Sequence, residues 1–287
     1  MLKILSFFYL LPNFKGRRRL FNFLKNLYLI YGKPIIWVKG NIGDMKIDLR
    51  SFEWLYLLDR DYDSEKKFFC LPFVDENKIN VDVGANIGFW SIAMGQKILK
   101  LNGKGKIIAI EPHPENFNRL KENILKNGLS KIVFPKQIAF SASNGFLNLI
   151  MREDFQNNSM TGNASISLGK SNDHDKGFSK IKIEAKTFDD FFSDKEIENL
   201  GFVKIDIEGH EDYFFKGAKK LINKRVPVFF ELALPYYRAR GIKDKDIINF
   251  FNTIFNKCKF YDGLQTVKDL SKLKISNISN VLVLPNK

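Results

Sequence analysis

The chain of 287 residues is 45% hydrophobic and carries a formal net charge of +14 at pH 7, which suits one large globular domain or a domain with an appendage. Its two cysteines, Cys70 and Cys258, lie far apart without a CxxC spacing. The composition therefore excludes a disulfide framework and a cysteine zinc site, and it fits a reducing, cytoplasmic compartment. No apolar run in the sequence reaches the ~18–20 residues that a membrane-spanning helix requires.

The N-terminal stretch MLKILSFFYLLPNFKGRRR combines a short apolar run with a basic cluster. No small-residue cleavage site follows the run, so we expect the stretch to be retained rather than removed as a signal peptide. Residues 1–31 have two interpretations: a helix packed on the domain, or an aromatic and basic segment in peripheral contact with the inner, anionic face of a membrane. The positive charge also suggests nucleic acid, but most basic residues are dispersed lysines, which disfavours that partner.

Residues 1–60 are expected to form an N-terminal extension of helix and β-hairpin, and residues 61–287 the main domain. The hairpin is predicted at 35–50, where two β-type runs flank the turn signal NIGD. In the main domain, apolar strands alternate with helical patterns of about 10–15 residues, which indicates an α/β fold with a parallel sheet and helices on both faces. The predicted strands are 79–83, 106–112, 131–140, 202–209 and 226–233, and the predicted helices are 89–101, 114–127, 210–224 and 244–256.

The interval 141–201 interrupts this alternation. It holds two strand-like runs, FLNLI and KIKIEAK, on either side of a long polar segment. We expect an inserted β-hairpin whose loop lies near the carboxyl ends of the sheet strands. After the last helix, CKFYD and NVLVLP are expected to pair as antiparallel strands that close the sheet.

Acidic residues lie at the ends of three predicted strands. Asp82 precedes Gly84 by two residues, Glu111 ends the second strand, and Asp206 ends the strand before the 210–224 helix. A single acid at such a position is as often a solvated loop residue as a functional one. Because the carboxyl ends of adjacent parallel strands meet at one edge of a sheet, the three together predict a single ligand crevice.

The stretch VDVGANIGFWSIA at 81–93 indicates what this crevice binds. A buried strand followed by a glycine-rich turn and a helix is typical of a nucleotide site, and Glu111 is placed to accept hydrogen bonds from both ribose hydroxyls. The turn lacks the G-x-G-x-x-G pattern that brings a pyrophosphate close to a helix, and Asp82 would repel phosphate. These features favour S-adenosylmethionine, which has a sulfonium, an ammonium and no phosphate, over NAD.

Several motifs, taken in order, resemble those of the FkbM-type methyltransferases: VDVGANIGFWSI, IEPHPENFNRLKENILKNG, TFDDFF, and VKIDIEGHEDYFFKGAKKLI followed by VPVFFEL. The resemblance covers residues 62–285 and does not explain the N-terminal extension. It implies a class I, Rossmann-like fold with a seven-stranded, mostly parallel sheet. It also implies S-adenosylmethionine as methyl donor and O-methylation of hydroxyls on sugars or other natural products. His113 and His210 depart from the family pattern, which more often has Asn and a small residue there.

The resemblance also implies roles for individual residues. Glu111 would hold the ribose, Pro112 and His113 would border the adenine, and Asp206 would face the methionine end or the acceptor. Residues 137–139, at the end of the third strand, would contact the base edge. The full donor-binding set is Glu65, Asp82, Gly84, Asn86, Gly88, Glu111, Pro112, His113, Gln137, Ala139 and Asp206.

Methylation of a sugar hydroxyl requires removal of the hydroxyl proton, so a base or a metal is expected. His210 is the first candidate, because the dipole of the following helix keeps an imidazole neutral; its alternative is a supporting or exposed histidine. Glu208 is the competing base, with helix capping as its alternative, and Asp206 completes the catalytic set. Asp206, Glu208 and Glu231 would also suit Mg²⁺, and the sequence does not distinguish a metal site from a charge-neutralised pocket.

The function inferred from the sequence is an S-adenosylmethionine-dependent O-methyltransferase that acts on a hydroxyl of a glycan, a glycolipid or a related natural product, as in polysaccharide biosynthesis. A different enzymatic function, RNA or protein methylation, is supported by the positive charge. Against RNA, the core has no interleaved basic and aromatic pattern. A scaffold without turnover and an NAD enzyme are two further possibilities, and thermal melting with each ligand separates them from a methyltransferase.

Overall fold

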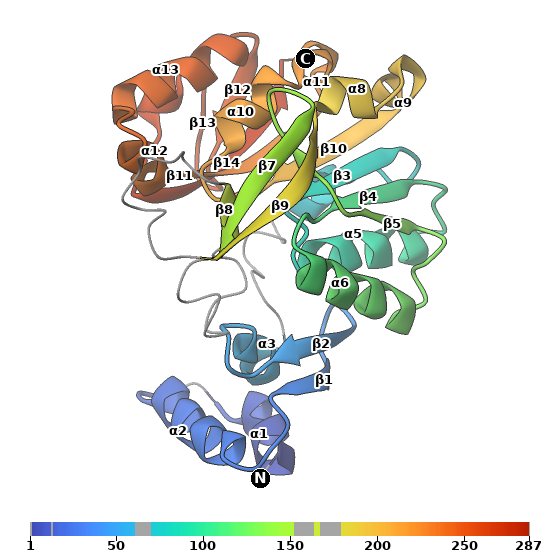
Figure 1. Cartoon of the computed structure of the whole chain (residues 1–287), viewed down its shortest axis with the longest axis vertical. Helices are drawn as coiled ribbons and strands as arrows, with labels where there is room; N and C mark the ends of the chain where they lie inside the picture. Colours follow the sequence, from blue (N-terminus) through green and yellow to red (C-terminus); the bar gives the residue numbers. More distant parts are fainter. Residues whose placement is uncertain (1, 13, 61–69, 152–163, 167–178, 287) are drawn as a thin grey trace.

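The computed structural model describes residues 2–12, 14–60, 70–151, 164–166 and 179–286 (Figure 1). The N-terminal helices lie at one end of the long axis of the molecule, and a large sheet covered by helices lies toward the other end. In these described parts of the chain, none of the helices has the length and apolarity of a membrane-spanning segment.

The large sheet has the strand order β13-β12-β14-β11-β10-β3-β4-β5. The five strands from β11 to β5 are parallel, and β14 runs antiparallel between β11 and β12. This is the Rossmann-like, mostly parallel sheet that the sequence predicted, with a two-residue strand, β13, added at one edge. The strands are β3 (Ile79–Val83), β4 (Lys106–Ile110), β5 (Val133–Lys136), β10 (Leu200–Ile205), β11 (Val228–Ala233), β12 (Cys258–Tyr261), β13 (Thr266–Val267) and β14 (Ile278–Pro285).

Helices cover both faces of the sheet, as the alternating pattern predicted (Figure 1). One face is covered by α5 (Phe89–Lys100) and α6 (Pro114–Lys126), whose buried side chains share a core with the N-terminal elements. The opposite face holds a phenylalanine-rich core. The elements that contribute to it are α8 (Phe188–Phe191), α9 (Asp194–Glu198), α10 (Glu211–Lys216), α11 (Lys219–Lys224), α12 (Leu234–Ala239), α13 (Asp244–Ile254) and η4 (Leu270–Lys272).

The N-terminal extension packs on the α5 and α6 face through side-chain amides of α6. Asn123 accepts from the backbone N–H of Lys46 at 2.7 Å and donates to the carbonyl of Ile87 at 2.7 Å. Asn127 accepts from the N–H of Asp44 at 2.8 Å and donates to its carbonyl at 2.7 Å. The extension comprises α1 (Leu2–Phe7), η1 (Phe8–Leu10), α2 (Arg17–Leu29), the hairpin of β1 (Ile35–Lys39) and β2 (Asp44–Asp48), and α3 (Trp54–Asp59); η2 (Leu71–Phe73) follows it.

The third predicted strand, 131–140, was wrong as a single strand. β5 ends at Lys136, and the chain then leaves the large sheet. Pro135 lacks an N–H and is tolerated because β5 is the edge strand, where that donor is not needed. The rest of the predicted run, β6 (Ala139–Phe140), pairs instead with β9 of a second sheet.

The second sheet is the insertion expected at 141–201. Its two long strands, β7 (Gly145–Met151) and β9 (Ser179–Lys186), form the predicted antiparallel hairpin. β8 (Ala164–Ile166) pairs with β7, and β6 pairs with β9, so the insertion is a four-stranded sheet rather than a simple hairpin. In Figure 1 it crosses in front of the large sheet.

Candidate active site

The turn after β3, residues 84–88, leads directly into the N-terminus of α5. The N–H groups of Gly84 and Ala85 donate to the carbonyl of Ile110 at 3.0 and 2.9 Å, which ties the turn to the end of β4. Gly84 has a φ of +76°, and a Cβ there would overlap the carbonyl oxygen of Asp206. Only glycine therefore permits this close approach of β3 and β10. Gly88, with a φ of +103°, directly precedes the first residue of α5.

Glu111 holds this turn from the neighbouring strand. Its Oε2 accepts from the backbone N–H of Asn86 at 2.8 Å, and its Oε1 accepts from the N–H of His113 at 2.9 Å. The side chain is buried, and burial raises the pKa of Glu111 to about 7 against the opposing effect of these hydrogen bonds. The sequence predicts a ribose ligand at this carboxylate, and the geometry adds a structural role in shaping the turn.

Lys204, which sequence reasoning missed, links the acids at the ends of β3 and β10. Its Nζ lies 3.2 Å from Oδ1 of Asp82 and 3.7 Å from Oδ2 of Asp206, and it donates to the carbonyl of Gly84 at 2.9 Å. Asp82 is fully buried and also accepts from Ser91 Oγ at 2.6 Å. Its carboxylate therefore supports the turn from beneath, and its charge is compensated by Lys204. The charge argument against a phosphate ligand is weaker for that reason.

Lys204 had a detectable signal in the sequence. It stands between Val203 and Ile205 in a strand whose residues are all buried. Lysine is almost never fully buried unless it is paired. A lysine inside an apolar strand, two residues before Asp206, thus indicates a buried ion pair, and pairing of β10 with β3 supplies Asp82 as the partner.

The loop after β10 presents Glu208 and is anchored by Glu211. Glu208 adopts a left-handed backbone with φ of +55°, which is uncommon for a residue other than glycine. Glu211 Oε1 accepts from the N–H groups of Ile207 (3.1 Å) and Gly209 (3.3 Å), and Tyr237 Oη donates to its Oε2 at 2.7 Å. Burial and the neighbouring Asp206 raise the pKa of Glu208 to about 8.

His210 lies at the start of α10, as predicted, and it is buried. Its Nε2 is 3.0 Å from Ser141 Oγ, and its ring stacks on Tyr213 with centroids 4.7 Å apart. Burial lowers the pKa of His210 to about 4, so the imidazole is neutral at physiological pH; the cause is burial rather than the helix dipole on which the sequence prediction rested. Arg240, which pairs with Asp212 and donates to the carbonyl of Gly209 at 2.9 Å, braces the same loop.

Comparison with known proteins assigns this arrangement. A family model, the methyltransferase FkbM domain, matches residues 82–260. The chain belongs to the FkbM methyltransferase family. Residues 82–260 are thus an S-adenosylmethionine-dependent methyltransferase domain, as the motifs implied.

Two curated relatives match at low identity. Methyltransferase sdnD of Sordaria araneosa is 29% identical over 161 residues, which cover 50% of this chain and 61% of that protein. Hexuronic acid methyltransferase AglP of Haloferax volcanii is 25% identical over 177 residues, which cover 62% of each protein. The match therefore spans less than two thirds of the length of either relative.

Solved structures of methyltransferases are also similar. The FkbM methyltransferase from Methylobacillus flagellatus has a TM-score of 0.45 and 17% identity, covering 80% of this chain and 52% of that one. An S-adenosylmethionine-dependent O-methyltransferase from Thermotoga maritima has a TM-score of 0.43 and 11% identity, covering 91% and 82%.

The residues around the turn after β3, residues 84–88, fit S-adenosylmethionine. Oδ1 of Asn86 is a buried acceptor without a hydrogen-bond partner among the described residues, at the centre of the turn. An ammonium donor would satisfy such an acceptor. Glu111 supplies a carboxylate at the end of the adjacent strand, where a nucleoside ribose is expected in this type of fold.

The other residues predicted to bind the donor occupy different surroundings. Pro112 is half-buried and His113 is buried, both directly after Glu111. Gln137 is exposed next to Lys136, whose carbonyl accepts from the N–H of Glu111 at 3.1 Å. Ala139 is buried against Leu149 and Ile183 of the inserted sheet. Glu65 lies outside the described residues.

The suggested metal ligands do not form a metal site in the described part of the chain. Asp206, Glu208 and Glu231 are each partly buried near the ends of β10 and β11. The described residues contain no group of three or more His, Cys, Asp or Glu side chains that could hold a metal ion. The carboxylate of Asp206 instead forms an ion pair with Lys204.

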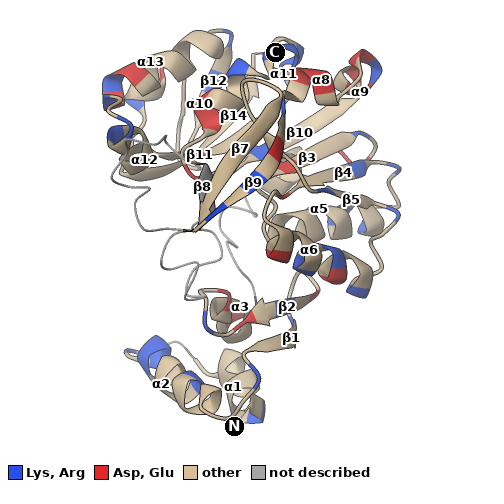
Figure 2. Ribbon diagram, viewed as in Figure 1, with Lys and Arg blue, Asp and Glu red and all other residues tan. Residues whose placement is uncertain are grey.

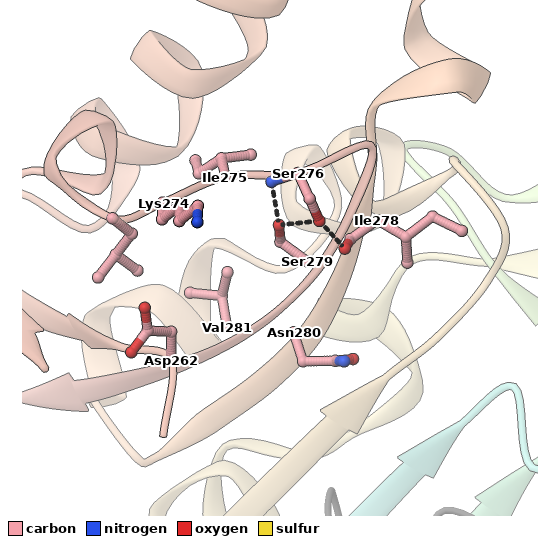
Figure 3. A pocket seen from close by; sticks show the side chains of 9 residues that line it. Asp262, Lys274, Ile275, Ser276, Ile278, Ser279, Asn280 and Val281 are labelled. Carbon is pink, nitrogen blue, oxygen red and sulfur yellow. Dashed lines mark hydrogen bonds between the residues drawn. The ribbon is translucent and has the colours of Figure 1, made fainter. Parts of the chain in front are cut away.

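A separate polar hollow of about 200 Å³ lies beside β14 (Figure 3). Ser276 and Ser279 hydrogen-bond to each other there, with Ser276 N to Ser279 Oγ at 2.9 Å. Side chains alternate along a strand, and Val281, which lines the hollow, belongs to the core opposite the α5 face. None of the residues that line the hollow is among the predicted site residues, and we assign it no role in methyl transfer.

Proposed function

We propose that the protein transfers the methyl group of S-adenosylmethionine to a hydroxyl of a sugar in a glycan, a glycolipid or a related natural product. Membership of the FkbM family and the name of the hexuronic acid methyltransferase relative support this acceptor class. The observation that carries the proposal is Glu208, a carboxyl with a pKa of about 8 next to Asp206. A hydroxyl must lose its proton during methylation, and a base is most effective when its pKa lies near the working pH.

Each residue has a distinct task in this mechanism. When bound, S-adenosylmethionine supplies a methyl group activated by its sulfonium. Glu111 and the 84–88 turn orient the nucleoside, and Lys204 fixes that turn through the carbonyl of Gly84. Glu208 accepts the hydroxyl proton as the acceptor oxygen bonds to the methyl carbon and the carbon–sulfur bond breaks.

We assign the base to Glu208 rather than to His210, which the sequence favoured. An imidazole with a pKa of about 4 is neutral but is a weak proton acceptor. Its Nε2 is already engaged with Ser141, at the end of β6, where the inserted sheet joins the domain. His210 therefore acts in this proposal as a positioning residue that connects the loop to the inserted sheet.

Radiolabelled methyl transfer tests the proposal. Purified protein is incubated with methyl-labelled S-adenosylmethionine and fractionated extract of the source organism, with the Glu208→Gln variant as the control. Label in a carbohydrate or glycolipid fraction that is stable to mild base, as an ether is, supports sugar O-methylation. Label that disappears on treatment with nuclease or protease instead overturns the acceptor class and favours RNA or protein methylation.

A glycolipid acceptor would be presented at a membrane. Peripheral membrane contact through residues 1–31, expected from the sequence as one of two interpretations, is compatible with such an acceptor and is a proposal separate from the acceptor class.

A further inference from the structure

The N-terminal extension exposes an unusual amount of apolar surface. Of the 21 large hydrophobic side chains that are exposed among the described residues, 13 lie between Ile4 and Trp37. They include Phe7 (61% exposed), Phe23 (61%) and Tyr31 (96%). Scattered single apolar residues are normal on a protein surface, but a concentration of this kind marks an interaction site.

The geometry of α2 explains why these side chains are exposed. Arg17, Phe21 and Lys25, spaced by four residues, form the side of the helix that is buried against the protein. Leu20, Phe23 and Leu27, spaced by three and four residues, form a neighbouring stripe that is exposed. Phe21 is the apolar residue of the buried side, with Leu24 and Tyr28 partly buried beside it, so the apolar stripe of Leu20, Phe23 and Leu27 is not used in the fold. We call the exposed apolar side chains of α1, η1 and α2 the N-terminal face: Ile4, Phe7, Tyr9, Leu10, Leu20, Phe23 and Leu27.

The N-terminal face is held by a network of arginine hydrogen bonds. Arg17 donates to the carbonyls of Phe8 and Leu58 at 2.9 and 3.1 Å and pairs with Asp59 at 3.2 Å. Arg60 donates to the carbonyl of Ser6 at 2.5 Å, and its guanidinium lies over the ring of Tyr9. These contacts join α1, η1 and α2 to α3, so the fold holds the side chains of the N-terminal face in fixed positions.

The charge of the same segment has one sign. Residues 1–43 contain eight basic side chains and no acidic one, and the first acidic residue is Asp44. This segment thus contributes +8 to the net charge of +14 of the chain. Figure 2 shows Lys and Arg on α1 and α2 and no Asp or Glu there.

We infer that the N-terminal face docks on the surface of an anionic lipid bilayer. Exposed aromatic and aliphatic side chains insert at the boundary between headgroups and acyl chains, and neighbouring cations are attracted to anionic headgroups. A soluble anionic partner would account for the charge but not for the apolar stripe on α2. The docking would place the enzyme at a membrane, and it does not depend on which hydroxyl is methylated.

Vesicle sedimentation of the full chain tests this inference. The probes are vesicles of phosphatidylcholine alone and vesicles that contain phosphatidylglycerol, at low and high salt. We expect binding to the phosphatidylglycerol vesicles at low salt and weaker binding at high salt, because salt shortens the range of charge attraction to a few ångströms. Absence of binding to phosphatidylglycerol vesicles at low salt would overturn the inference.

Matched variants separate the N-terminal face from the overall charge. Lys15→Glu/Arg19→Glu reverses two exposed cations beside the face, and Lys195→Glu/Lys245→Glu makes the same change in net charge on α9 and α13. The first pair should bind phosphatidylglycerol vesicles on the order of tenfold or more weakly, and the second should bind like the natural protein. Equal losses in the two variants would contradict a specific face.

A second comparison tests the apolar stripe. Phe23→Ser/Leu27→Ser should reduce vesicle binding severalfold, whereas Leu125→Ser, at a 72% exposed position of α6, should not. Gel filtration decides between the membrane and a second copy of the chain as the partner of the N-terminal face. The face would be assigned to self-association if the natural protein formed a concentration-dependent dimer, Phe23→Ser/Leu27→Ser abolished that dimer, and the natural protein did not bind vesicles. Methyl transfer to a water-soluble acceptor should be unchanged in all these variants, so a failure of docking is distinguishable from a failure of the proposed function.

Discussion

Replacement of Lys204 by methionine tests the buried ion pair of the site most directly. Methionine has a similar length and no charge, so the change removes the ammonium and preserves most of the packing. Lys204 is 2% exposed and Asp82 is fully buried, so the variant leaves a buried carboxylate without its cation. Breaking a buried ion pair by removing one partner costs about 3–5 kcal/mol, because the remaining charge is uncompensated. The hydrogen bond from Nζ to the carbonyl of Gly84 is lost as well.

The matching double variant separates charge from packing. In Asp82→Asn/Lys204→Met the buried carboxylate is gone, and the amide oxygen of the new side chain still accepts from Ser91 Oγ. We therefore expect the double variant to be more stable than Lys204→Met, with a coupling energy of about 1–3 kcal/mol between the two positions. Asp206 is less affected, since its carboxylate is 27% exposed and remains solvated.

Urea unfolding followed by circular dichroism measures these free energies, and the slope of the transition reports whether unfolding stays two-state. A loss below about 1 kcal/mol in Lys204→Met, or a double variant whose loss equals the sum of the single losses, would falsify the buried-pair argument. A second readout is the rise in melting temperature on addition of S-adenosylmethionine, which should shrink in Lys204→Met because the donor turn loses its support.

Further changes probe the other acids. Glu111→Ala should weaken S-adenosylmethionine binding strongly, because the ribose hydroxyls lose their hydrogen-bond acceptor and the N–H groups of Asn86 and His113 lose the acceptor that shapes the turn. Unchanged affinity in calorimetry would remove the ribose assignment. The rate of methyl transfer should rise with pH up to about 8, where Glu208 ionises, and Glu208→Gln should abolish that rise and slow transfer on the order of 10²–10⁴-fold. His210→Ala should keep the rise in rate, whereas its loss in that variant would return the role of base to the histidine. Between pH 4.5 and 7 Glu111 and Glu211 should each make the melting temperature fall as pH rises. Their pKa values are about 7 when folded against an ordinary 4.5, so the folded state binds more protons at these two sites than the unfolded state, whereas His210, with a pKa lowered to about 4, acts in the opposite direction. Glu211→Gln should flatten this dependence, and identical slopes in both proteins would count against the raised pKa of Glu211.

Much of the fold followed from the periodicity of the sequence. The strands at 79–83 and 106–112, the helices after them and the closing antiparallel pair all lie close to where the pattern placed them. The run 131–140 predicts one strand because its apolar pattern continues through Pro135. Periodicity does not record which sheet a segment joins, so the transfer of Ala139–Phe140 to the inserted sheet could not be derived from it.

The candidate site followed from the sequence in its acids and glycines, and the structure supplied what connects them. Local sequence placed Asp82, Glu111 and Asp206 at strand ends, because a strand end is a local property. The position of Lys204 beside Asp82 depends on strand pairing between residues 122 positions apart, and that of Ser141 against His210 on a contact across 69 positions. Such contacts are set by strand order, which only the folded chain determines.

The sequence by itself determined the α/β class through its alternation of strand and helix patterns, and it determined the glycine-rich turn after residue 83 and the family through short motifs. It also determined that the N-terminal segment is basic and apolar. Tertiary structure decided which apolar side chains of that segment stay exposed, because one side of α2 is buried by contacts with distant residues. It likewise decided which carboxylates are paired and which have a raised pKa, because both properties arise from burial and from neighbours that are remote in the sequence.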